Sequence, residues 1–266
     1  MTQLTDNIAQ FNTSANSYDD DFTFSDIGIL QRERVYYWLN QIDFFSTPKK
    51  IFEINCGTGY DAEQFHEKGH TVFATDVSDG MITYAKQQRS DKINFETQSF
   101  QQVAQNSELS NYDTLFSNFG GLNCIDNNQL SDFFNGVSSH QKKGNQLILV
   151  LMSKHCLMEN IYFFLKFNFS KINRRNTNTG VEVNVKDEQV KTYYYLPKEI
   201  TQLLKSNYKI QLIKPVACFL PPSYMEPFFK KHKKVLSFIN RLEHFFGRFT
   251  FIAKWSDHYI IIAERK

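Results

Sequence analysis

The feature that most constrains this chain is a glycine turn that follows a short apolar run. Residues 50–55 (KIFEIN) are typical of a buried strand, and the chain continues as Cys56-Gly57-Thr58-Gly59. Glycine allows a backbone to approach a ligand closely, and the helix expected after such a turn offers free N–H groups. A G-x-G turn without further features is a weak signal, because it also occurs as a tight connection that binds nothing.

The order of strands and helices around this turn predicts a parallel sheet. Helices are expected at residues 26–42, 61–68, 78–89 and 127–137, and further strands at residues 71–75, 92–97, 112–117 and 146–152. Strands that alternate with helices at this spacing indicate a parallel sheet with helices on both faces. Such sheets bind ligands at the carboxyl ends of their strands. The residues that fall at this edge are Gly57, Asp76, Ser99 and Asn118.

An acidic residue follows the second strand, where a ribose-binding carboxylate is expected. Asp76 comes about 20 residues after the glycine turn. A carboxylate there accepts both ribose hydroxyls, although a helix cap is the alternative reading. Glu53 helps to distinguish cofactors, because an acid repels a pyrophosphate and attracts an amino-acid ammonium. Glu53 therefore favours S-adenosylmethionine over a nicotinamide dinucleotide. The glycine-rich fingerprint of dinucleotide-binding proteins is still possible here, because it allows alanine at the position of Ala62.

Composition and charge exclude several classes of protein. The 266 residues carry a net charge of +2, from 30 basic and 28 acidic residues, which excludes a globally basic nucleic-acid binder. No stretch is long and apolar enough to span a bilayer, and the polar N-terminus lacks a signal core. The cysteines indicate a reducing, cytoplasmic compartment and no metal site, because no pair has ligand spacing. They are Cys56, Cys124, Cys156 and Cys218.

Together these motifs resemble the class I S-adenosylmethionine-dependent methyltransferases, in their UbiE/BioC-like small-molecule group. The similarity covers residues 11–152. Glu53 to Gly59 resembles the first motif of the family, and Thr75-Asp76-Val77-Ser78 with Met81 resembles the second. Residues 112–118 (YDTLFSN) resemble the strand that ends beside the transferring methyl group. The residues that resemble the helical lid over the cofactor are Phe11, Ala15, Tyr18, Asp19 and Phe22.

The resemblance implies an α/β fold with a Rossmann-like, doubly wound sheet of seven strands. The sheet would be mostly parallel with an antiparallel last strand, and an N-terminal helical lid and a C-terminal α+β cap insertion would flank it. The implied divisions are a lid at residues 1–46, a cofactor-binding core at 47–152, a substrate-cap insertion with the sixth strand at 153–255, and the last strand at 256–266.

The resemblance also implies how the cofactor is bound. Backbone at the glycine turn would line methionine and ribose, Asp76 would hold the ribose hydroxyls, and Val77 and Phe100 would sandwich the adenine ring. Asn118 would approach the sulfonium, and Tyr18 would belong to the lid. The full cofactor-binding set is Tyr18, Glu53, Asn55, Gly57, Gly59, Asp76, Val77, Met81, Ser99, Phe100 and Asn118.

Two positions depart from the family pattern. Asn55 replaces the usual first glycine, and asparagine tolerates a left-handed backbone better than most residues. Ser99 stands where many relatives have an aspartate that contacts the adenine amino group, and its hydroxyl can still accept that bond. These departures leave one alternative open, in which the chain binds the cofactor but has lost catalysis.

Methyl transfer needs positioning more than acid–base chemistry, because the sulfonium already activates the methyl group. A hydroxyl acceptor also needs a base, whereas a carbon or amine acceptor does not always need one. The candidate bases are His155, after the fifth strand, and His258, which opens the last strand. Solvated or structural roles are the alternative for both, so neither is singled out. We slightly favour O-methylation of a small molecule.

After Met152 the pattern changes, and much of the aromatic content falls there. The expected elements are a helix at residues 156–167, a hairpin at 181–185 and 190–195, a helix at 197–206, a strand at 208–219, a helix at 224–246 and a strand at 258–263. Of the chain's residues, 26 are Phe. We interpret the insertion as an aromatic pocket for the methyl acceptor, with ordinary core packing by Phe as the alternative.

A local basic run leaves a second functional reading open. Lys230, Lys231, Lys233, Lys234 and Arg241 lie close to Phe228 and Phe229 in the expected helix. A basic amphipathic helix can lie on an anionic membrane, and a solvated helix face is the alternative. The runner-up function is therefore a quinone-precursor or lipid methyltransferase with a weak membrane-surface contact. The near-neutral total charge argues against nucleic acid as a partner.

Overall fold

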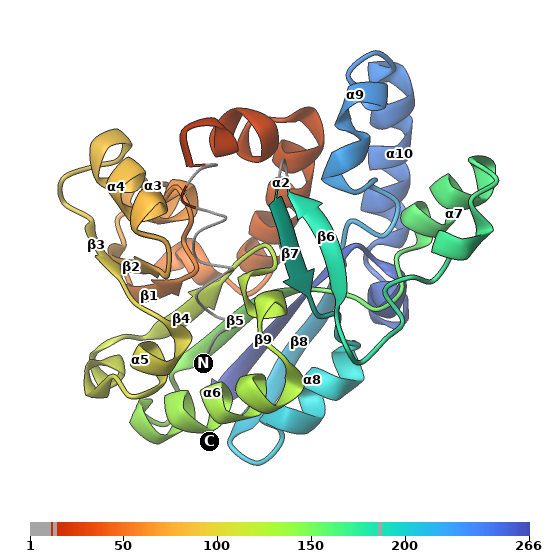
Figure 1. The fold of residues 1–266 in the computed structure, drawn as a ribbon. Coiled ribbons are helices and arrows are strands. Elements are labelled where there is room, and N and C mark those ends of the chain that lie inside the picture. Colours follow the sequence, from red (N-terminus) through yellow and green to blue (C-terminus); the bar gives the residue numbers. More distant parts are fainter. Residues whose placement is uncertain (1–11, 13–14, 186–187) are drawn as a thin grey trace.

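The computed structural model describes residues 12, 15–185 and 188–266, around a seven-stranded sheet with the order β3-β2-β1-β4-β5-β9-β8 (Figure 1). The strands β3, β2, β1, β4 and β5 pair in parallel, whereas β9 is antiparallel to both β5 and β8. The expected Rossmann-like sheet with an antiparallel last strand is confirmed. The strands are β1 (Lys50–Ile54), β2 (Thr71–Asp76), β3 (Asn94–Thr97), β4 (Thr114–Ser117), β5 (Gln146–Met152), β8 (Tyr208–Val216) and β9 (His258–Arg265).

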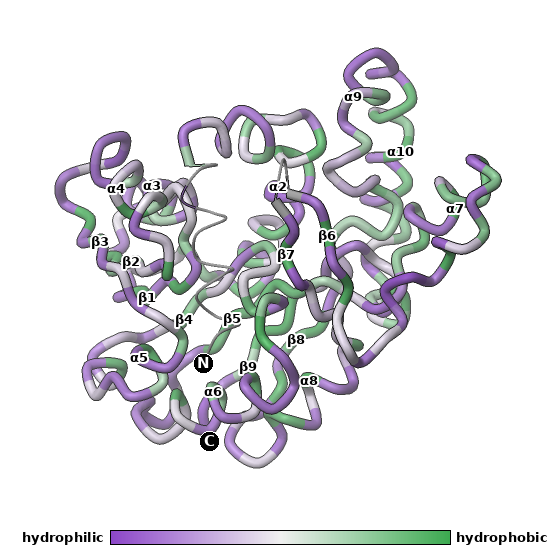
Figure 2. The backbone as a smooth tube through the Cα atoms, viewed as in Figure 1, coloured by the Kyte–Doolittle hydropathy of each residue, from purple (hydrophilic) through white to green (hydrophobic). Residues whose placement is uncertain are grey.

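Helices cover both faces of this sheet. Side chains of β5 alternate between two hydrophobic clusters: Leu147, Leu149 and Leu151 face one, and Ile148 and Val150 face the other. A strand buried on both faces needs no polar positions, which explains the continuous apolar run in its sequence. Figure 2 shows the same hydrophobic character along the central strands. One face carries α2 (Asp26–Asn40), α3 (Tyr60–Glu67) and α4 (Asp79–Gln88), and the other carries α5 (Phe100–Ala104), α6 (Asn127–His140) and α8 (Pro197–Leu204).

The expected elements of the first half are present, with ends shifted by at most three residues. The sequence pattern misses α5. A capping box marks the first turn of this helix, in which the Ser99 hydroxyl accepts the N–H of Gln102 and the Gln102 side chain accepts the N–H of Ser99. The helix is only five residues long, which is too short for a periodic pattern to reveal it.

The second half differs more from expectation. The hairpin consists of β6 (Val181–Val185) and β7 (Glu188–Thr192), so its second strand begins and ends earlier than predicted. The edge strand β8 stops at Val216 because Ala217 adopts a left-handed conformation with φ 63°. The Phe-rich helix is α7 (Leu157–Leu165).

The single helix expected at residues 224–246 is two helices, α9 (Glu226–Phe229) and α10 (Lys233–Phe246). The carboxylate of Glu226 accepts the N–H groups of Asp26 and Ile27 at 3.0 Å each, which fixes α9 against the first turn of α2. The chain then leaves helical geometry at His232, with φ −125° and ψ 50°. A tertiary contact, and not a Gly or Pro signal, therefore divides this segment.

Alanine substitutions at two glycines compare the packing around Gly59, in the glycine turn, with that around Gly144, which lies elsewhere in open space. A methyl group on Gly59 (φ 75°) would lie 2.7 Å from the Phe95 ring, whereas one on Gly144 (φ 89°) would meet nothing within 4 Å. Both Ala variants carry left-handed strain of about 1–2 kcal/mol. Only Gly59→Ala adds overpacking, so we expect it to lose about 2–4 kcal/mol in all. Urea unfolding of both variants checks this, and equal losses would contradict the close packing.

Candidate active site

The glycine turn lies at the carboxyl edge of the sheet, between the ends of β1, β2 and β4. Asn55 (φ 47°), Gly57 (φ 54°) and Gly59 (φ 75°) all have left-handed backbones, so the expected tolerance of Asn55 for this conformation is confirmed. The Asn55 amide also bridges two strands. Its Nδ2 donates to the carbonyl oxygen of Asn118 at 2.8 Å, and its Oδ1 accepts the Ser117 hydroxyl at 2.7 Å.

The carboxylate of Asp76 is fixed by backbone donors. Its Oδ2 accepts the N–H of Gly57 and its Oδ1 the N–H of Ser78, both at 2.9 Å. Burial raises the pKa of Asp76, and hydrogen bonds from the backbone of Ser78, Gly57 and Val77 oppose that shift. A methyl group on Gly57 would meet nothing within 4 Å, so space is open beside this backbone. The sequence-predicted ribose site is thus a preorganised acceptor next to an open turn.

Glu53 is buried in β1 with one carboxylate oxygen unpartnered. Its exposed fraction is 1%, and its Oε2 has no hydrogen-bond partner among the described residues. Burial raises the pKa of Glu53 well above its usual value, and the charge of Asp61 adds to this, while Arg32 opposes it. A buried carboxylate of this kind is costly unless a cation or a donor reaches it.

Asp61, which the sequence reading did not select, organises the neighbouring side chains. Its Oδ1 accepts the Arg32 guanidinium at 2.9 Å and the Tyr36 hydroxyl, and its Oδ2 accepts Nδ2 of Asn118 at 2.9 Å. The Asn118 Oδ1 in turn accepts the N–H of Phe119 at 3.0 Å. Asn118 therefore stands in a fixed orientation. Arg32 comes from α2, and no motif in that helix marks it.

The N-terminal segment is attached to the glycine turn. Asp19 is buried, accepts the Thr58 hydroxyl at 2.6 Å and forms an ion pair with Arg89 of α4. Further along the edge, the side-chain oxygen of Asn12 accepts the Ser78 hydroxyl at 2.6 Å and the N–H of Gly80 at 2.9 Å. The segment thus reaches both sides of Asp76.

Tyr18 belongs to this attached segment. Burial raises its pKa to about 12, and the nearby charge of Arg32 opposes the shift. Phe11, also part of the expected lid, lies outside the described residues. The division of the chain into lid, core, cap and last strand remains a prediction.

The residues expected to sandwich adenine line one small cavity. Val77 and Phe100 share a cavity of about 20 Å³ with Ile54, Asn55, Thr75, Gln98 and Val103. This volume suits a single water, so a purine needs the slot to widen. Met81 is buried in α4 below, and Ser99 uses its hydroxyl to cap α5. Whether Ser99 also contacts adenine remains a prediction.

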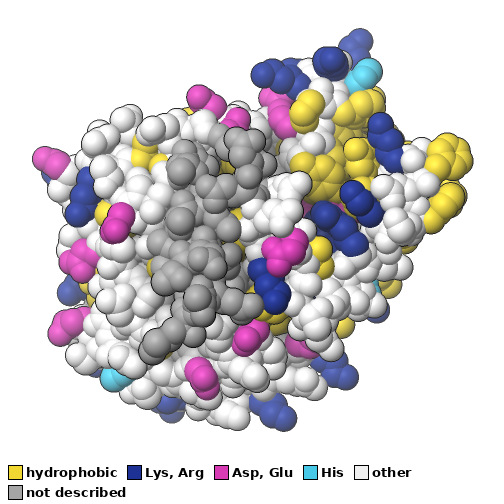
Figure 3. Space-filling model, in the orientation of Figure 1, with side chains coloured by type: hydrophobic (Ala, Val, Ile, Leu, Met, Phe, Trp, Pro, Cys, Tyr) yellow, Lys and Arg dark blue, Asp and Glu magenta, His cyan; other side chains and the backbone are white. Residues whose placement is uncertain are grey.

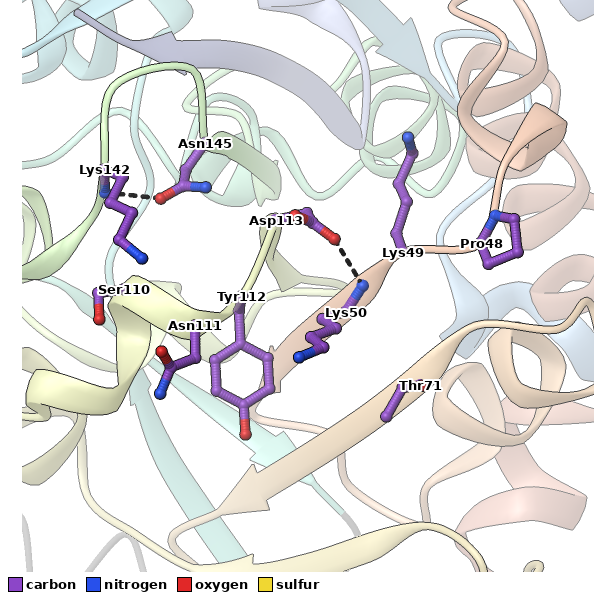
Figure 4. A pocket seen from close by; sticks show the side chains of 10 residues that line it. All are labelled: Pro48, Lys49, Lys50, Thr71, Ser110, Asn111, Tyr112, Asp113, Lys142 and Asn145. Atoms are coloured by element: carbon purple, nitrogen blue, oxygen red, sulfur yellow. Dashed lines mark hydrogen bonds between the residues drawn. The ribbon is translucent and has the colours of Figure 1, made fainter.

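A larger hollow of about 550 Å³ lies at the opposite, amino end of the strands (Figure 4). It is open and polar, and in it the carboxylate of Asp113 accepts the N–H of Lys50 at 2.8 Å. Lys49, Lys142 and Tyr112 also line it. None of the predicted cofactor-binding residues lines it. Ligands of parallel sheets bind at the carboxyl end of the strands. We therefore place the site at the glycine turn, although the larger hollow is elsewhere.

The two candidate bases occupy different surroundings. His258 is buried, and its ring lies edge-on to Phe119 with centroids 5.4 Å apart. This contact places His258 against Phe119, the residue that follows Asn118. His155 is half-buried after β5, where burial and the charges of Lys254 and Lys154 lower its pKa. Among the described residues, His155 makes no hydrogen bond, ion pair or ring contact with Asn118 or Phe119.

The carboxylate of Asp257 lies beside the imidazole ring of His258. Its Oδ2 lies 3.3 Å from Nδ1 of His258, an ion-pair distance without hydrogen-bond geometry. Its Oδ1 lies 2.8 Å from Arg175, and Oδ2 also accepts Gln31 at 3.3 Å. Burial alone would raise the pKa of Asp257, but His258 and Arg175 hold it below its usual range. Asp257 is therefore a carboxylate at neutral pH.

The hairpin is connected to the same edge through Asn123, another residue that sequence reasoning missed. The Asn123 carbonyl accepts the N–H of Tyr193 at 2.7 Å, and its Oδ1 accepts the N–H of Met152 at 2.9 Å. Its Nδ2 donates to the carbonyl of Tyr193. The N–H of Tyr195 donates to the carbonyl of Met152 at 3.2 Å. These bonds anchor the chain leaving β7 beside the carboxyl end of β5 (Figure 1).

The aromatic pocket expected after Met152 remains a prediction, and the structure shows that its candidate residues differ in burial. Tyr194, Tyr195 and Phe229 are buried as packing groups. Many of the other aromatic side chains point outward, because the short helices that carry them pack only one face against the protein. The exposed ones from the expected pocket are Phe164, Phe167, Phe169, Phe228, Phe245 and Phe246, with exposed fractions between 40% and 81%.

Comparisons with known proteins agree with this geometry. Residues 51–144 match the family model described as a methyltransferase domain, a span that includes the glycine turn, Asp76 and Asn118. The structure of magnesium protoporphyrin IX methyltransferase from Synechocystis PCC 6803 with bound SAH is 14% identical, with 98% of this chain and 96% of that chain covered and a TM-score of 0.58. A SAM-dependent methyltransferase from Methanosarcina mazei is 16% identical, with coverages of 82% and 92% and a TM-score of 0.53. No curated protein matches significantly.

Asp76 offers a direct test of the ribose site. We expect Asp76→Ala to abolish measurable binding of S-adenosylhomocysteine in isothermal titration calorimetry, because both carboxylate oxygens are lost. Asp76→Asn keeps one acceptor for the turn and should still bind at least about tenfold more weakly. The matched control is Asp79→Ala, an exposed acid three residues later whose carboxylate accepts the Thr97 hydroxyl. Micromolar affinity in both Asp76 variants would refute the ribose role.

Glu53 offers a second test, with opposite effects on stability and binding. The unfolded chain ionises Glu53 at its ordinary pKa, whereas the folded chain holds the proton to higher pH. The wild type therefore loses stability as pH rises from that ordinary pKa to the raised one. Above this window Glu53→Gln should be more stable by about 1–3 kcal/mol, and near pH 4 the two should be equal.

The measurement is urea unfolding of both proteins across pH without cofactor, followed by titration with S-adenosylhomocysteine. The Gln variant should bind it about tenfold more weakly or worse, since it lacks a negative charge for the ammonium. A wild type that is the more stable protein at neutral pH would show that Glu53 already has a partner.

Proposed function

We propose that this chain, which carries a class I S-adenosylmethionine-dependent methyltransferase domain, methylates a hydroxyl of a small apolar or aromatic molecule. Two parts of the carboxyl edge support the proposal. The glycine turn with Glu53 and Asp76 suits the cofactor, and the group around Phe119 and His258 suits an acceptor. We also propose that the domain falls in the UbiE/BioC-like small-molecule group, which its sequence motifs resemble.

The residues on the cofactor side already present hydrogen-bond acceptors that suit S-adenosylmethionine. The unpartnered Oε2 of Glu53 is an acceptor for an ammonium group. Asp76 presents a carboxylate already oriented by two N–H groups, beside the open space at Gly57. The cofactor supplies a methyl group that its sulfonium has already activated, so these residues only need to bind, orient and exclude water.

The observation that carries the acceptor proposal is the conformation of Phe119. This residue has φ 45°, which is a genuine outlier for a bulky side chain, and such strain gathers at functional sites. Its ring lies 5.4 Å from that of His258 and 5.0 Å from the guanidinium carbon of Arg32. An aromatic ring held directly after Asn118 supports a flat, apolar acceptor packed against it.

His258 is the base that best suits O-methylation. The acceptor oxygen bonds to the methyl carbon as the carbon–sulfur bond breaks, and the hydroxyl proton passes to the His258 imidazole. Asp257 and Arg175 act as positioning residues, because the Asp257 carboxylate stabilises the imidazolium that results. His155 lacks such a partner contact and is the weaker candidate.

Two alternatives retain specific support. A quinone precursor or lipid at a membrane surface would also be apolar, and the outward-facing aromatic side chains favour it. A catalytically silent module would keep the Asp76 site and lack turnover. The formation of S-adenosylhomocysteine with any acceptor excludes the silent module.

The experiment is a turnover assay with a panel of apolar phenols, hydroxylated lipids and small polar acceptors, followed by mass spectrometry of the product. We expect an apolar hydroxyl compound to be methylated. With that substrate, His258→Gln should lower kcat about 10²–10⁴-fold, as expected for loss of a general base. The matched control, His155→Gln, should leave kcat unchanged.

The pH profile separates a base from a packing role. Loss of the base should remove the ascending limb of kcat against pH, whereas a packing defect would lower kcat evenly across pH. Methylation of small polar acceptors alone, or a His258→Gln enzyme with wild-type kcat, would contradict the proposal.

A further inference from the structure

The outward-facing aromatic residues of the second half form a distinct surface that the active site does not use. Of the seventeen large hydrophobic side chains that are exposed in the described residues, fourteen lie between Ile161 and Trp255. Exposed apolar groups on soluble proteins are normally scattered, and a concentration of this kind marks an interaction site. We define the basic aromatic surface as the exposed side chains of α7 and the turn after it (residues 161–171) and of α9 and α10 (residues 226–246).

On α10 the exposed apolar residues follow one face of the helix. Val235, Phe238 and Phe245 are 46%, 59% and 56% exposed, and Leu242 between them is half-buried. The opposite face, with Leu236 and Glu243, is buried in the protein. The helix therefore presents an apolar strip to solvent beside its exposed polar residues Ser237, Arg241 and His244.

The tip of α7 repeats the pattern. Phe164, Leu165, Phe167 and Phe169 are 57% to 81% exposed. The Phe169 ring contacts the other two rings, with centroids 5.9 Å from Phe164 and 6.3 Å from Phe167. Figure 3 shows hydrophobic side chains gathered at the upper right, over α9 and α10 and at the projecting end near α7, with Lys and Arg around them.

The exposed charges of this surface all have one sign. The acids of the two segments are Glu226 and Glu243, and Glu159 lies just before the first segment; each of the three is used internally. Glu159 binds Arg174 and Arg175, Glu226 caps α2, and Glu243 accepts the N–H groups of Ala217 and Phe219. The exposed cations are Lys166, Lys171, Lys230, Lys231, Lys233, Lys234 and Arg241.

We propose that the basic aromatic surface docks on a bilayer that contains anionic lipid. Phenylalanine rings enter the boundary between headgroups and acyl chains, and the surrounding lysines meet the negative headgroups. Among the described residues no helix is both long and apolar enough to cross a membrane. This docking goes beyond methyl transfer and does not depend on the identity of the acceptor.

Charge complementarity favours lipid over the other occupants. A second copy of this chain would bring the same cations face to face and would be repelled. An acidic protein would pair with the lysines. The exposed phenylalanines, however, lie on two separate protrusions, and a bilayer can adapt to both more readily than one rigid protein surface.

The test is sedimentation of the full chain with vesicles, at about 0.1 M salt, where exposed charges still act over about 10 Å. We expect binding to phosphatidylcholine vesicles with about 30% phosphatidylserine and much weaker binding to pure phosphatidylcholine. The triple variant Lys230→Glu/Lys231→Glu/Lys234→Glu should lose at least about 100-fold in partition, from about fivefold for each cation removed.

A second variant, Phe238→Ser/Phe245→Ser, should reduce partition about tenfold or more for each ring that inserts. The matched control, Lys142→Glu/Lys143→Glu, changes two exposed lysines after α6 and should bind nearly as the wild type does. All variants should keep the wild-type melting temperature and affinity for S-adenosylhomocysteine, because the replaced side chains are exposed.

Equal loss in the control would assign the binding to total charge and overturn the proposal. Absence of binding to both vesicle types would overturn it too, and sedimentation velocity would then assign the surface to a second copy if the chain dimerises. Binding to polyglutamate but not to anionic vesicles would assign it to an acidic protein.

Discussion

The burial of several carboxylates at one edge of a parallel sheet is the constraint on which this structure depends. Asp19, Glu53, Asp61 and Asp76 come from different elements and are nearly inaccessible to water. The free-energy cost of burying an unpaired charge is far larger than the gain from a single contact. Each buried acid therefore requires a cation or hydrogen-bond donors beside it. Arg32 is drawn to Asp61, Arg89 to Asp19, and the backbone of the glycine turn to Asp76.

These compensations connect elements that are distant in sequence. The Asp19 pair joins the N-terminal segment to α4, and the Asp61 group joins α2 and α3 to the end of β4. Among these four acids, Glu53 is the one whose carboxylate has an oxygen without a hydrogen-bond partner in the described residues. An unpartnered oxygen of a buried carboxyl group suits a positively charged cofactor better than an anionic one.

A second ionic group organises the other half of the molecule. Glu159 forms ion pairs with two arginines. One of them, Arg175, also pairs with Asp257, whose carboxylate lies beside the His258 ring. Such buried pairs contribute little net stability, and their value lies in fixing one arrangement. Here they hold α7 and the following polar stretch against the sheet edge by one side. The opposite side of α7, with Ile161, Phe164 and Leu165, is consequently left in solvent.

The sequence by itself determined the sheet, its helices, the glycine turn and Asp76, because these follow from local period and spacing along a continuous stretch. It also placed Asn55 in a left-handed turn. It did not reveal Asp61, Arg32 or Asn123, because their roles arise from partners far away in the chain. The excess of phenylalanine could be counted but not oriented. Only the tertiary structure decided that these side chains face outward, since burial depends on which neighbours pack against each helix.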